Sequence, residues 1–157
     1  MPSSDNHSSD PSRPARRRAM EAFAASDAHT LAAAWDAIAG EAPVTSLRSP
    51  EVGLVMLQGR IGGSGAPFNI GEGSVTRASM RLASGEVGHA MIMGRDADHA
   101  RLAAQLDAGW QRDDWRAAIE AMVVGPALTK QEEADRRSAE ETEATRVDFF
   151  TMVRGDE

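Results

Sequence analysis

The residues best suited to binding an anion are arginines near a glycine-rich segment. Residues 59–73 read GRIGGSGAPFNIGEG, and Arg60 stands beside the first glycine. Backbone N–H groups in such a loop can form a nest for an anion. No Gly-Lys-Ser/Thr follows, and the next segment is typical of a strand rather than of a helix whose N-terminus would hold phosphate. The alternative is a plain hairpin loop that needs glycine for its backbone angles, and the anion site requires Arg60, Arg77 and Arg81 to converge.

A second candidate is the pair Asp96 and His99, which stand three residues apart at the expected start of a helix. This spacing places both side chains on the first helical turn, as a general acid/base pair or two metal ligands would require. The structural alternative is that Asp96 caps the helix and His99 finds a partner nearby. His89 lies among methionines and is expected at the edge of the core.

The composition excludes several classes of protein. The 157 residues contain no cysteine, which excludes disulfides, thiolate metal sites and an Fe–S cluster held by this chain. The net charge of -7 argues against binding nucleic acid or an anionic membrane through overall charge. There is no HExxH motif, nucleophile elbow or tyrosine, so no complete catalytic set and no metal site are expected. No apolar run approaches the roughly 20 residues of a membrane span, and the protein is expected to be soluble.

The periodicity of apolar residues predicts an α+β fold. Residues 1–13 are polar and read as a disordered tail, and helical patterns begin at Pro14, with Ser26 as a possible N-cap of a second helix. Residues 53–61, 74–82 and 86–94 alternate as antiparallel strands. We therefore expect an antiparallel sheet of three or more strands, flanked by N-terminal and C-terminal helices, within a single domain over residues 14–128.

The last two strands are expected to form a hairpin whose register decides which residues are buried. With Ser84 and Gly85 as a two-residue loop, Arg77 and Arg81 fall on the face that a ligand or partner can reach. A slip of one residue would reverse this assignment. With the two-residue loop, the core face is expected to hold Thr76, Ala78, Met80 and Leu82 on one strand and Val87, His89, Met91 and Met93 on the other.

The last 33 residues, from Gly125 on, differ in composition from the rest of the chain. Gly125-Pro126 is a typical helix terminator, and residues 129–146 are charged on all sides, which predicts an exposed polar helix. An apolar segment follows this helix, and we group the helix and the segment as one unit over residues 129–157. This segment suits docking on a partner, or alternatively a last strand of the chain's own sheet. The proposed docking residues are Arg146, Asp148, Phe149, Phe150 and Arg154.

Four short sequences carry a family resemblance. They are GLVMLQGRIGGSG at residues 53–65, TRASMRL at 76–82, GRDADHA at 94–100 and RVDFFTMVRGD at 146–156. Together they closely resemble the PhnG family, subunits of the bacterial carbon–phosphorus lyase system. The resemblance runs from the first helices to the C-terminus without the N-terminal tail, and the order and spacing of the motifs make it specific.

The resemblance implies a cytoplasmic multi-subunit complex that degrades phosphonates when phosphate is scarce. In that family, PhnG acts with PhnH, PhnI and the ATPase-like PhnL to displace adenine from MgATP with methylphosphonate, forming α-D-ribose 1-methylphosphonate 5-triphosphate. PhnJ completes the core complex and holds the Fe–S cluster. The resemblance supplies no catalytic residue and no cofactor bound by this chain alone.

With a triphosphate and a phosphonate as ligands, charged side chains could contact phosphate groups or a partner. The candidates are Arg60, Arg77, Arg81, Arg95, Asp96 and His99. Two other functions stay open: a stand-alone module that binds a phosphorylated metabolite, and a purely structural adaptor.

Overall fold

The computed structural model describes residues 13–61 and 65–144 of the chain. It is an α+β fold with a three-stranded antiparallel sheet, as predicted. The elements, in chain order, are α1 (Arg13–Ala25), α2 (Ala28–Ile38), β1 (Val44–Arg60), β2 (Pro67–Leu82), β3 (Val87–Met93), α3 (Ala97–Trp110), α4 (Asp113–Ile119), the π-helix η2 (Glu120–Val124) and α5 (Gly125–Ala144).

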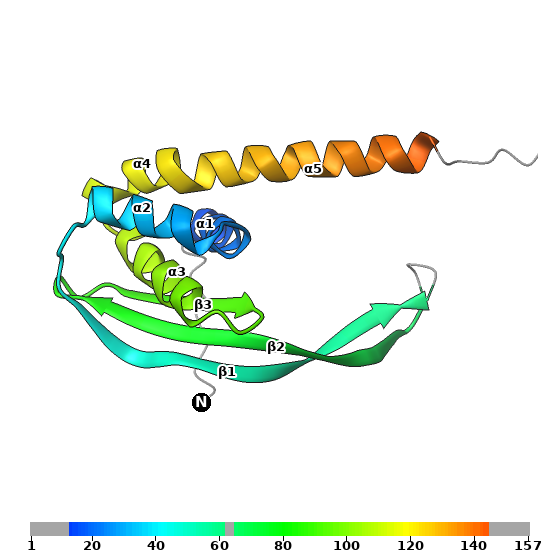
Figure 1. The fold of residues 1–157 in the computed structure, drawn as a ribbon, viewed down its shortest axis with the longest axis horizontal. Coiled ribbons are helices and arrows are strands. Elements are labelled where there is room, and N and C mark those ends of the chain that lie inside the picture. Colours follow the sequence, from blue (N-terminus) through cyan, green and yellow to red (C-terminus); the bar gives the residue numbers. More distant parts are fainter. Residues whose placement is uncertain (1–12, 62–64, 145–157) are drawn as a thin grey trace, which may run out of the picture.

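The sheet has the order β1-β2-β3, and its first two strands are much longer than the third. They continue past β3 as a two-stranded ribbon (Figure 1). Together with Val52 and Gly53 at its base, we call this ribbon the arm and define it as residues 52–60 with 67–74. Irregularities between Ser46 and Arg48 and between Arg48 and Glu51 interrupt the alternation in β1. These bulges explain why the sequence pattern predicted a strand only from residue 53.

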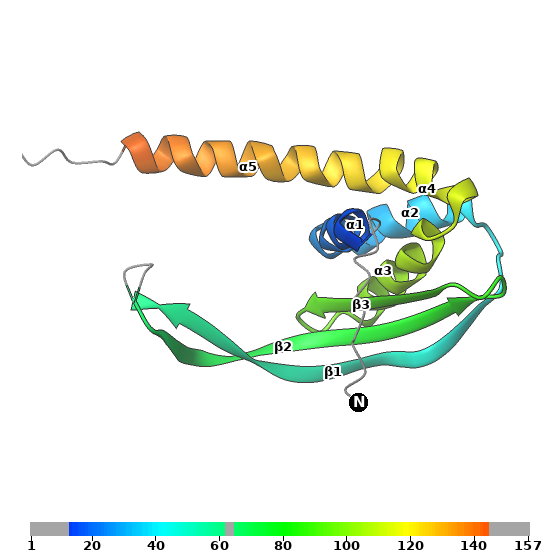
Figure 2. The same cartoon turned by 180° about the vertical axis from the view of Figure 1, so that it is seen from behind.

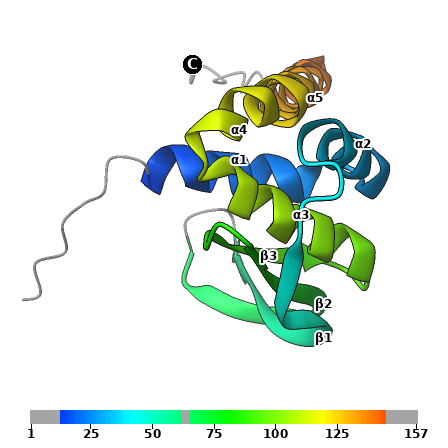
Figure 3. The same cartoon turned by 90° about the vertical axis from the view of Figure 1, so that its left-hand side faces the viewer.

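Helix α3 is the centre of the core. It packs against β2 and β3 on one side and against α1 and α2 on the other (Figure 3). Residues 102–110 are buried without interruption. The approach to the sheet is close, since a Cβ on Gly88 would lie 2.0 Å from the carbonyl oxygen of Ala104. The absence of a side chain at Gly88 therefore lets the backbone of α3 lie directly on β3.

The hairpin between β2 and β3 has a different register from the predicted one. The Leu82 N–H donates to Glu86, and Gly85 has φ of 112°, so the loop contains three residues and ends on a glycine in the left-handed region. One extra loop residue moves every side chain of β3 to the other face. Gly88, Ala90 and Ile92 pair with the core face of β2, whereas His89, Met91 and Met93 are exposed on the outer face beside Arg77 and Arg81. The prediction was right for β2 and wrong for β3, and His89 is not at the edge of the core.

Helix α5 begins where the sequence predicted a stop. The Gly125 N–H bonds to the carbonyl of Glu120, the i to i−5 pattern of η2. This wider turn accommodates Pro126, which lacks an N–H and would otherwise clash with the preceding turn. The Gly125-Pro126 terminator was therefore wrong. Residues 129–143 of α5 are exposed, and Figure 2 shows α5 and the arm projecting from the body in the same direction.

The N-cap of α2 is Asp27 rather than Ser26. The Asp27 carboxylate accepts from the N–H and the hydroxyl of Thr30, both at 2.8 Å, whereas the Ser26 hydroxyl donates to the Ala22 carbonyl. These hydrogen bonds hold the pKa of Asp27 below its ordinary value.

Candidate functional site

Asp96 and His99 are close together and are engaged in structural contacts. The Asp96 carboxylate accepts from the His99 N–H at 2.8 Å and caps α3. The His99 ring is buried, and its Nε2–H donates to the Phe23 carbonyl at 2.9 Å, which ties α3 to α1. The structural alternative for this pair therefore fits the geometry. Over residues 13–61 and 65–144, no group of three or more His, Cys, Asp or Glu side chains could hold a metal ion.

Arg60 lies far from the other candidate arginines. It is the last residue of β1, at the tip of the arm, and donates to the Gly65 carbonyl at 3.1 Å. Arg77 lies opposite Glu51. Because a strand rises about 3.3 Å per residue, Arg60 and Arg77 are about 30 Å apart along the sheet. The structure therefore does not bring Arg60, Arg77 and Arg81 together at the glycine loop.

The outer face of the sheet holds a different basic cluster around a hollow of about 310 Å³, lined among others by Arg48, Arg77, Ser79 and His89. Arg48 and Arg77 share one oxygen of Glu51, at 3.6 Å and 3.1 Å. The Arg77 Nε is buried without a hydrogen-bond partner among the described residues. His89 Nδ1 lies 2.9 Å from the Ser79 hydroxyl. Arg48 was not predicted from the sequence, because its position on a bulged strand carries no periodic signal.

Arg95 follows β3 and reaches back along the sheet. Its Nε donates to the Ser74 hydroxyl at 3.4 Å. Arg81 is exposed at the opposite end of the β2–β3 hairpin, paired in register with Val87. Arg77, Arg81 and Arg95 therefore border the outer face at separate points rather than forming a single site.

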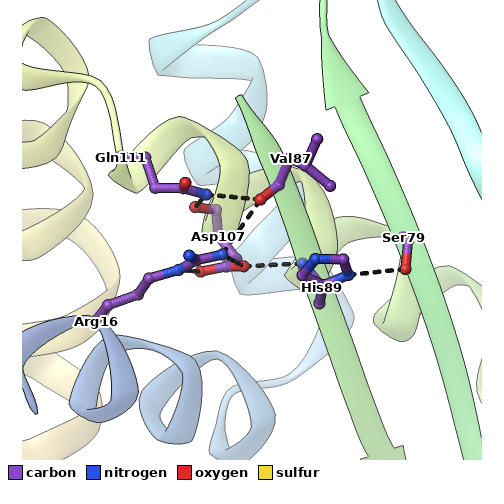
Figure 4. A network of polar contacts seen from close by, with 6 residues as sticks. All are labelled: Arg16, Ser79, Val87, His89, Asp107 and Gln111. Carbon is purple, nitrogen blue, oxygen red and sulfur yellow. Dashed lines mark hydrogen bonds and ion pairs between the residues drawn. The ribbon is translucent and has the colours of Figure 1, made fainter. Parts of the chain in front are cut away.

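A buried ion pair closes part of the sheet edge (Figure 4). The fully buried Asp107 accepts from Arg16 Nε at 2.8 Å, from Arg16 Nη2 at 2.7 Å and from the His89 N–H at 2.8 Å. Arg16 and Gln111 also donate to the Val87 carbonyl, at 3.2 Å and 2.8 Å. Hydrogen bonding to Asp107 and its negative charge raise the pKa of Arg16, although burial opposes them. Every polar atom of Asp107 is used here, so this network holds structure together rather than awaiting a ligand.

The arm exposes several large apolar side chains. Large hydrophobic side chains on the arm and at its tip are exposed, Leu54 by 64% and Ile70 by 65%. Val52 pairs with the buried Thr76, and Val52, Leu54 and Met56 alternate along β1, so these three side chains share one face of the ribbon. Exposed apolar side chains gathered on one element are typical of contact surfaces, so the arm is a candidate interaction surface. The full set is Val52, Leu54, Met56, Leu57, Ile61, Phe68 and Ile70.

The docking segment predicted at the C-terminus lies outside the described residues. This applies to Arg146, Asp148, Phe149, Phe150 and Arg154. Among the described helices, none is both long enough and apolar enough to cross a bilayer.

The fold and these surfaces define a class of protein: a small α+β protein with a long arm that exposes apolar side chains. Within that class the chain belongs to the PhnG family. Its residues 14–155 match the family described as phosphonate metabolism protein PhnG. It is also similar to a Rhizobium meliloti (strain 1021) protein named alpha-D-ribose 1-methylphosphonate 5-triphosphate synthase subunit PhnG. The two are 51% identical over 142 residues, which cover 90% of each chain. The family resemblance of the four short motifs is confirmed.

Proposed function

We propose that this chain is the PhnG subunit of an alpha-D-ribose 1-methylphosphonate 5-triphosphate synthase. The observation that carries this proposal is the 51% identity, over 90% of each chain, to a relative with that name. The chain acts as one subunit of an enzyme complex and contributes no complete active site of its own.

In the proposed reaction the complex transfers the ribose triphosphate moiety of ATP to methylphosphonate. A phosphonate oxygen forms a bond to the anomeric carbon, the bond from that carbon to adenine breaks, and adenine leaves. The expected partners are PhnH, PhnI and the ATPase-like PhnL, with PhnJ in the core complex carrying the Fe–S cluster. MgATP is a substrate of the complex, and the expected location is the cytoplasm.

The arm supports the role of an association subunit. Its exposed apolar side chains lie on a ribbon that projects from the rest of the fold in the same direction as the exposed helix α5 (Figure 2). A partner seated there would cover surface that is otherwise in contact with water, at about 25 cal/mol for each Å² of apolar area. In the assembly, Arg77, Arg81 and Arg95 on the outer face are candidates for contacts to phosphate groups or to partner carboxylates.

The test is purification of the tagged full-length chain from its native host under phosphate starvation. We expect the other synthase subunits to copurify in fixed ratio, and the complex to release adenine from ATP only when methylphosphonate is present. A complex that forms without this activity would contradict the proposed reaction. A lone monomer that binds phosphonate would instead support the stand-alone binding module.

A matched pair of variants tests the arm. Leu54→Ser with Met56→Ser should reduce recovery of the complex more than tenfold, because apolar anchors at an interface carry much of the binding energy. Met122→Ser makes a similar change at a residue that is 41% exposed on η2. Equal recovery of the complex with both proteins would contradict the role of the arm. A complex that assembles normally yet no longer releases adenine with the arm variant would also contradict it, as would collapse with Met122→Ser alone.

A further inference from the structure

Strand β3 forms one edge of the sheet, and its backbone groups alternate between β2 and open space. The Leu82 N–H donates to the Glu86 carbonyl at 3.0 Å and the Gly94 N–H to the Ser74 carbonyl at 2.8 Å, which fixes the phase of the ladder. Gly88, Ala90 and Ile92 therefore bond to β2. Val87, His89, Met91 and Met93 direct their N–H and C=O groups away from β2.

In the first half of β3, backbone groups that face away from β2 are already hydrogen-bonded to side chains of this protein. Asp107 accepts the His89 N–H, and Arg16 and Gln111 occupy the Val87 carbonyl (Figure 4). Beyond this point the His89 carbonyl, both backbone groups of Met91 and the Met93 N–H have no partner among residues 13–61 and 65–144. The side chains of Met91 and Met93 are 57% and 62% exposed. The far half is thus a short open template for another strand.

A groove runs along the open half. Two hollows share Met20, His89, Ala90 and Met91: one of about 260 Å³ between α1 and β3, and the one of about 310 Å³ on the outer face. The first is largely apolar, and its lining includes Phe23, Ala24, Ile92 and Ala103. A strand laid beside β3 would direct alternate side chains into the first hollow and over the second.

We propose that the open half of β3 receives an extended segment of a neighbouring subunit, which adds a fourth strand to the sheet. The segment carries apolar side chains at alternate positions, matching the hollow beside α1. On the other face it carries acidic side chains, since Arg48 and Arg77 share a single carboxylate oxygen of Glu51. This inference rests on the proposed function, because it assumes that the chain works inside an assembly.

The charges favour a different chain over a second copy of this one. Pairing of β3 with its own copy would bring two outer-face clusters of Arg48 and Arg77 to the same edge. Like charges at such close range disfavour the pair. An acidic partner strand meets the same residues with opposite charge, and main-chain hydrogen bonds supply the affinity.

Amide hydrogen exchange gives the direct test. The isolated full chain and the purified assembly are compared over a peptide spanning residues 87–94. We expect the Met91 and Met93 amides to exchange at least tenfold more slowly in the assembly, with Ala90 protected in both because it bonds to β2. Equal and fast exchange of Met91 in both samples would overturn the inference.

Two substitutions at Met91 distinguish the contribution of its backbone N–H from that of its side chain. Met91→Pro removes the N–H that faces the groove without removing a bond to β2, and proline is tolerated at edge strands for this reason. Met91→Ala keeps the N–H and shortens the side chain. We expect Met91→Pro to lower recovery of the assembly at least tenfold and Met91→Ala to lower it less than threefold. Equal effects of the two variants would overturn strand addition, and the exchange experiment decides the matter if Met91→Pro does not fold.

The failures of the two proposals are distinguishable. If the chain copurifies with the other subunits but Met91 stays unprotected, strand addition fails and the proposed function stands. If no assembly forms, the proposed function itself fails. A chain ending at Ala144 provides one more control. If Met91 is already protected in the isolated full chain and this shorter chain loses the protection, the occupant is the chain's own C-terminal segment and the partner strand is wrong.

Discussion

The same two strands, β1 and β2, build both the arm and the helix-covered part of the sheet, which we call the body. Apolar side chains are buried in the body and exposed on the arm. Where α3 covers β2, the facing residues Ala78, Met80 and Leu82 are almost fully buried. A few residues further along the same strands, Leu54 and Ile70 are mostly exposed. The difference shows that apolar content alone does not make a core. An apolar strand is a core element where a helix covers it and a contact surface where none does.

The sharpest test of this contrast compares one leucine in each region. Leu106 is completely buried in α3, and Leu106→Ala should lower the free energy of unfolding by about 4 kcal/mol through lost burial and the cavity left behind. Leu54→Ala on the arm should change it by less than about 0.5 kcal/mol. Urea denaturation of the isolated chain measures both. Similar losses would mean that the arm is folded against the body in solution, and the contrast would be broken.

The buried ion pair provides the next largest effect. Asp107→Ala leaves Arg16 and the His89 N–H without their acceptor, and we expect a loss of about 3 kcal/mol. This value is at the lower end for a buried pair because the Arg16 side chain is 30% exposed and can turn to water. The matched control is Asp98→Ala, which removes an exposed pair with Arg101 and should cost under about 0.5 kcal/mol. A neutral result for Asp107→Ala in urea denaturation would show that the network does not close the sheet edge.

Two glycines test how closely each region is packed. Gly88→Ala places a methyl group against the backbone of α3, 2.0 Å from the Ala104 carbonyl oxygen, and should cost about 2 kcal/mol or more. Gly71→Ala on the arm meets nothing within 4 Å and should be neutral or slightly stabilising. Thermal unfolding followed by circular dichroism measures the two shifts. A clear loss with Gly71→Ala would reveal a contact to the arm that the described residues do not make.

The smallest expected effect belongs to the helix cap at Asp27. Its pKa is lowered in the folded chain by the hydrogen bonds from Thr30, so the ionised form contributes stability above the ordinary carboxyl value of 3.8. That contribution is lost as the pH falls from there through the lowered folded pKa. Asp27→Asn keeps a capping side chain but does not titrate. The difference in urea midpoint between the wild type and Asp27→Asn should therefore shrink in acid, whereas a constant difference from pH 7 to pH 2 would contradict the assignment.

Local patterns in the sequence predicted the elements better than the contacts between them. The three strands, the helices around them and the Asp96 cap follow from periodicity over a few residues. The register of β3 did not, since a loop of three residues and one of two look alike when Ser84 and Gly85 are the only turn signal. Likewise, the pairing of Arg16 with Asp107 joins residues far apart in the chain and carries no local signal. Ionised side chains that end up buried look like surface residues until the fold brings them together.

The candidate site was predicted in part for the same reason. Arg77 and Arg81 fall on an accessible face because β2 was assigned correctly, but Arg48 and His89 reach that face only through a bulge and a changed register. The exposure of the arm could not be predicted from the sequence, because its alternating apolar residues are of the same types as those of a strand that a helix covers. Only the position of α3 decides which part of β2 is left uncovered.

The π turn at Glu120–Val124 fixes the rotational phase of everything that follows it. An α-helix advances by about 100° per residue, so the one additional residue in this turn rotates α5 about its axis by roughly that angle relative to an uninterrupted helix. Loss of a single residue here would convert the turn to α-helix and direct a different stripe of α5 toward the arm. The length of this short segment thus sets the rotation of α5 about its axis, and with it which residues of α5 lie on the side of the arm.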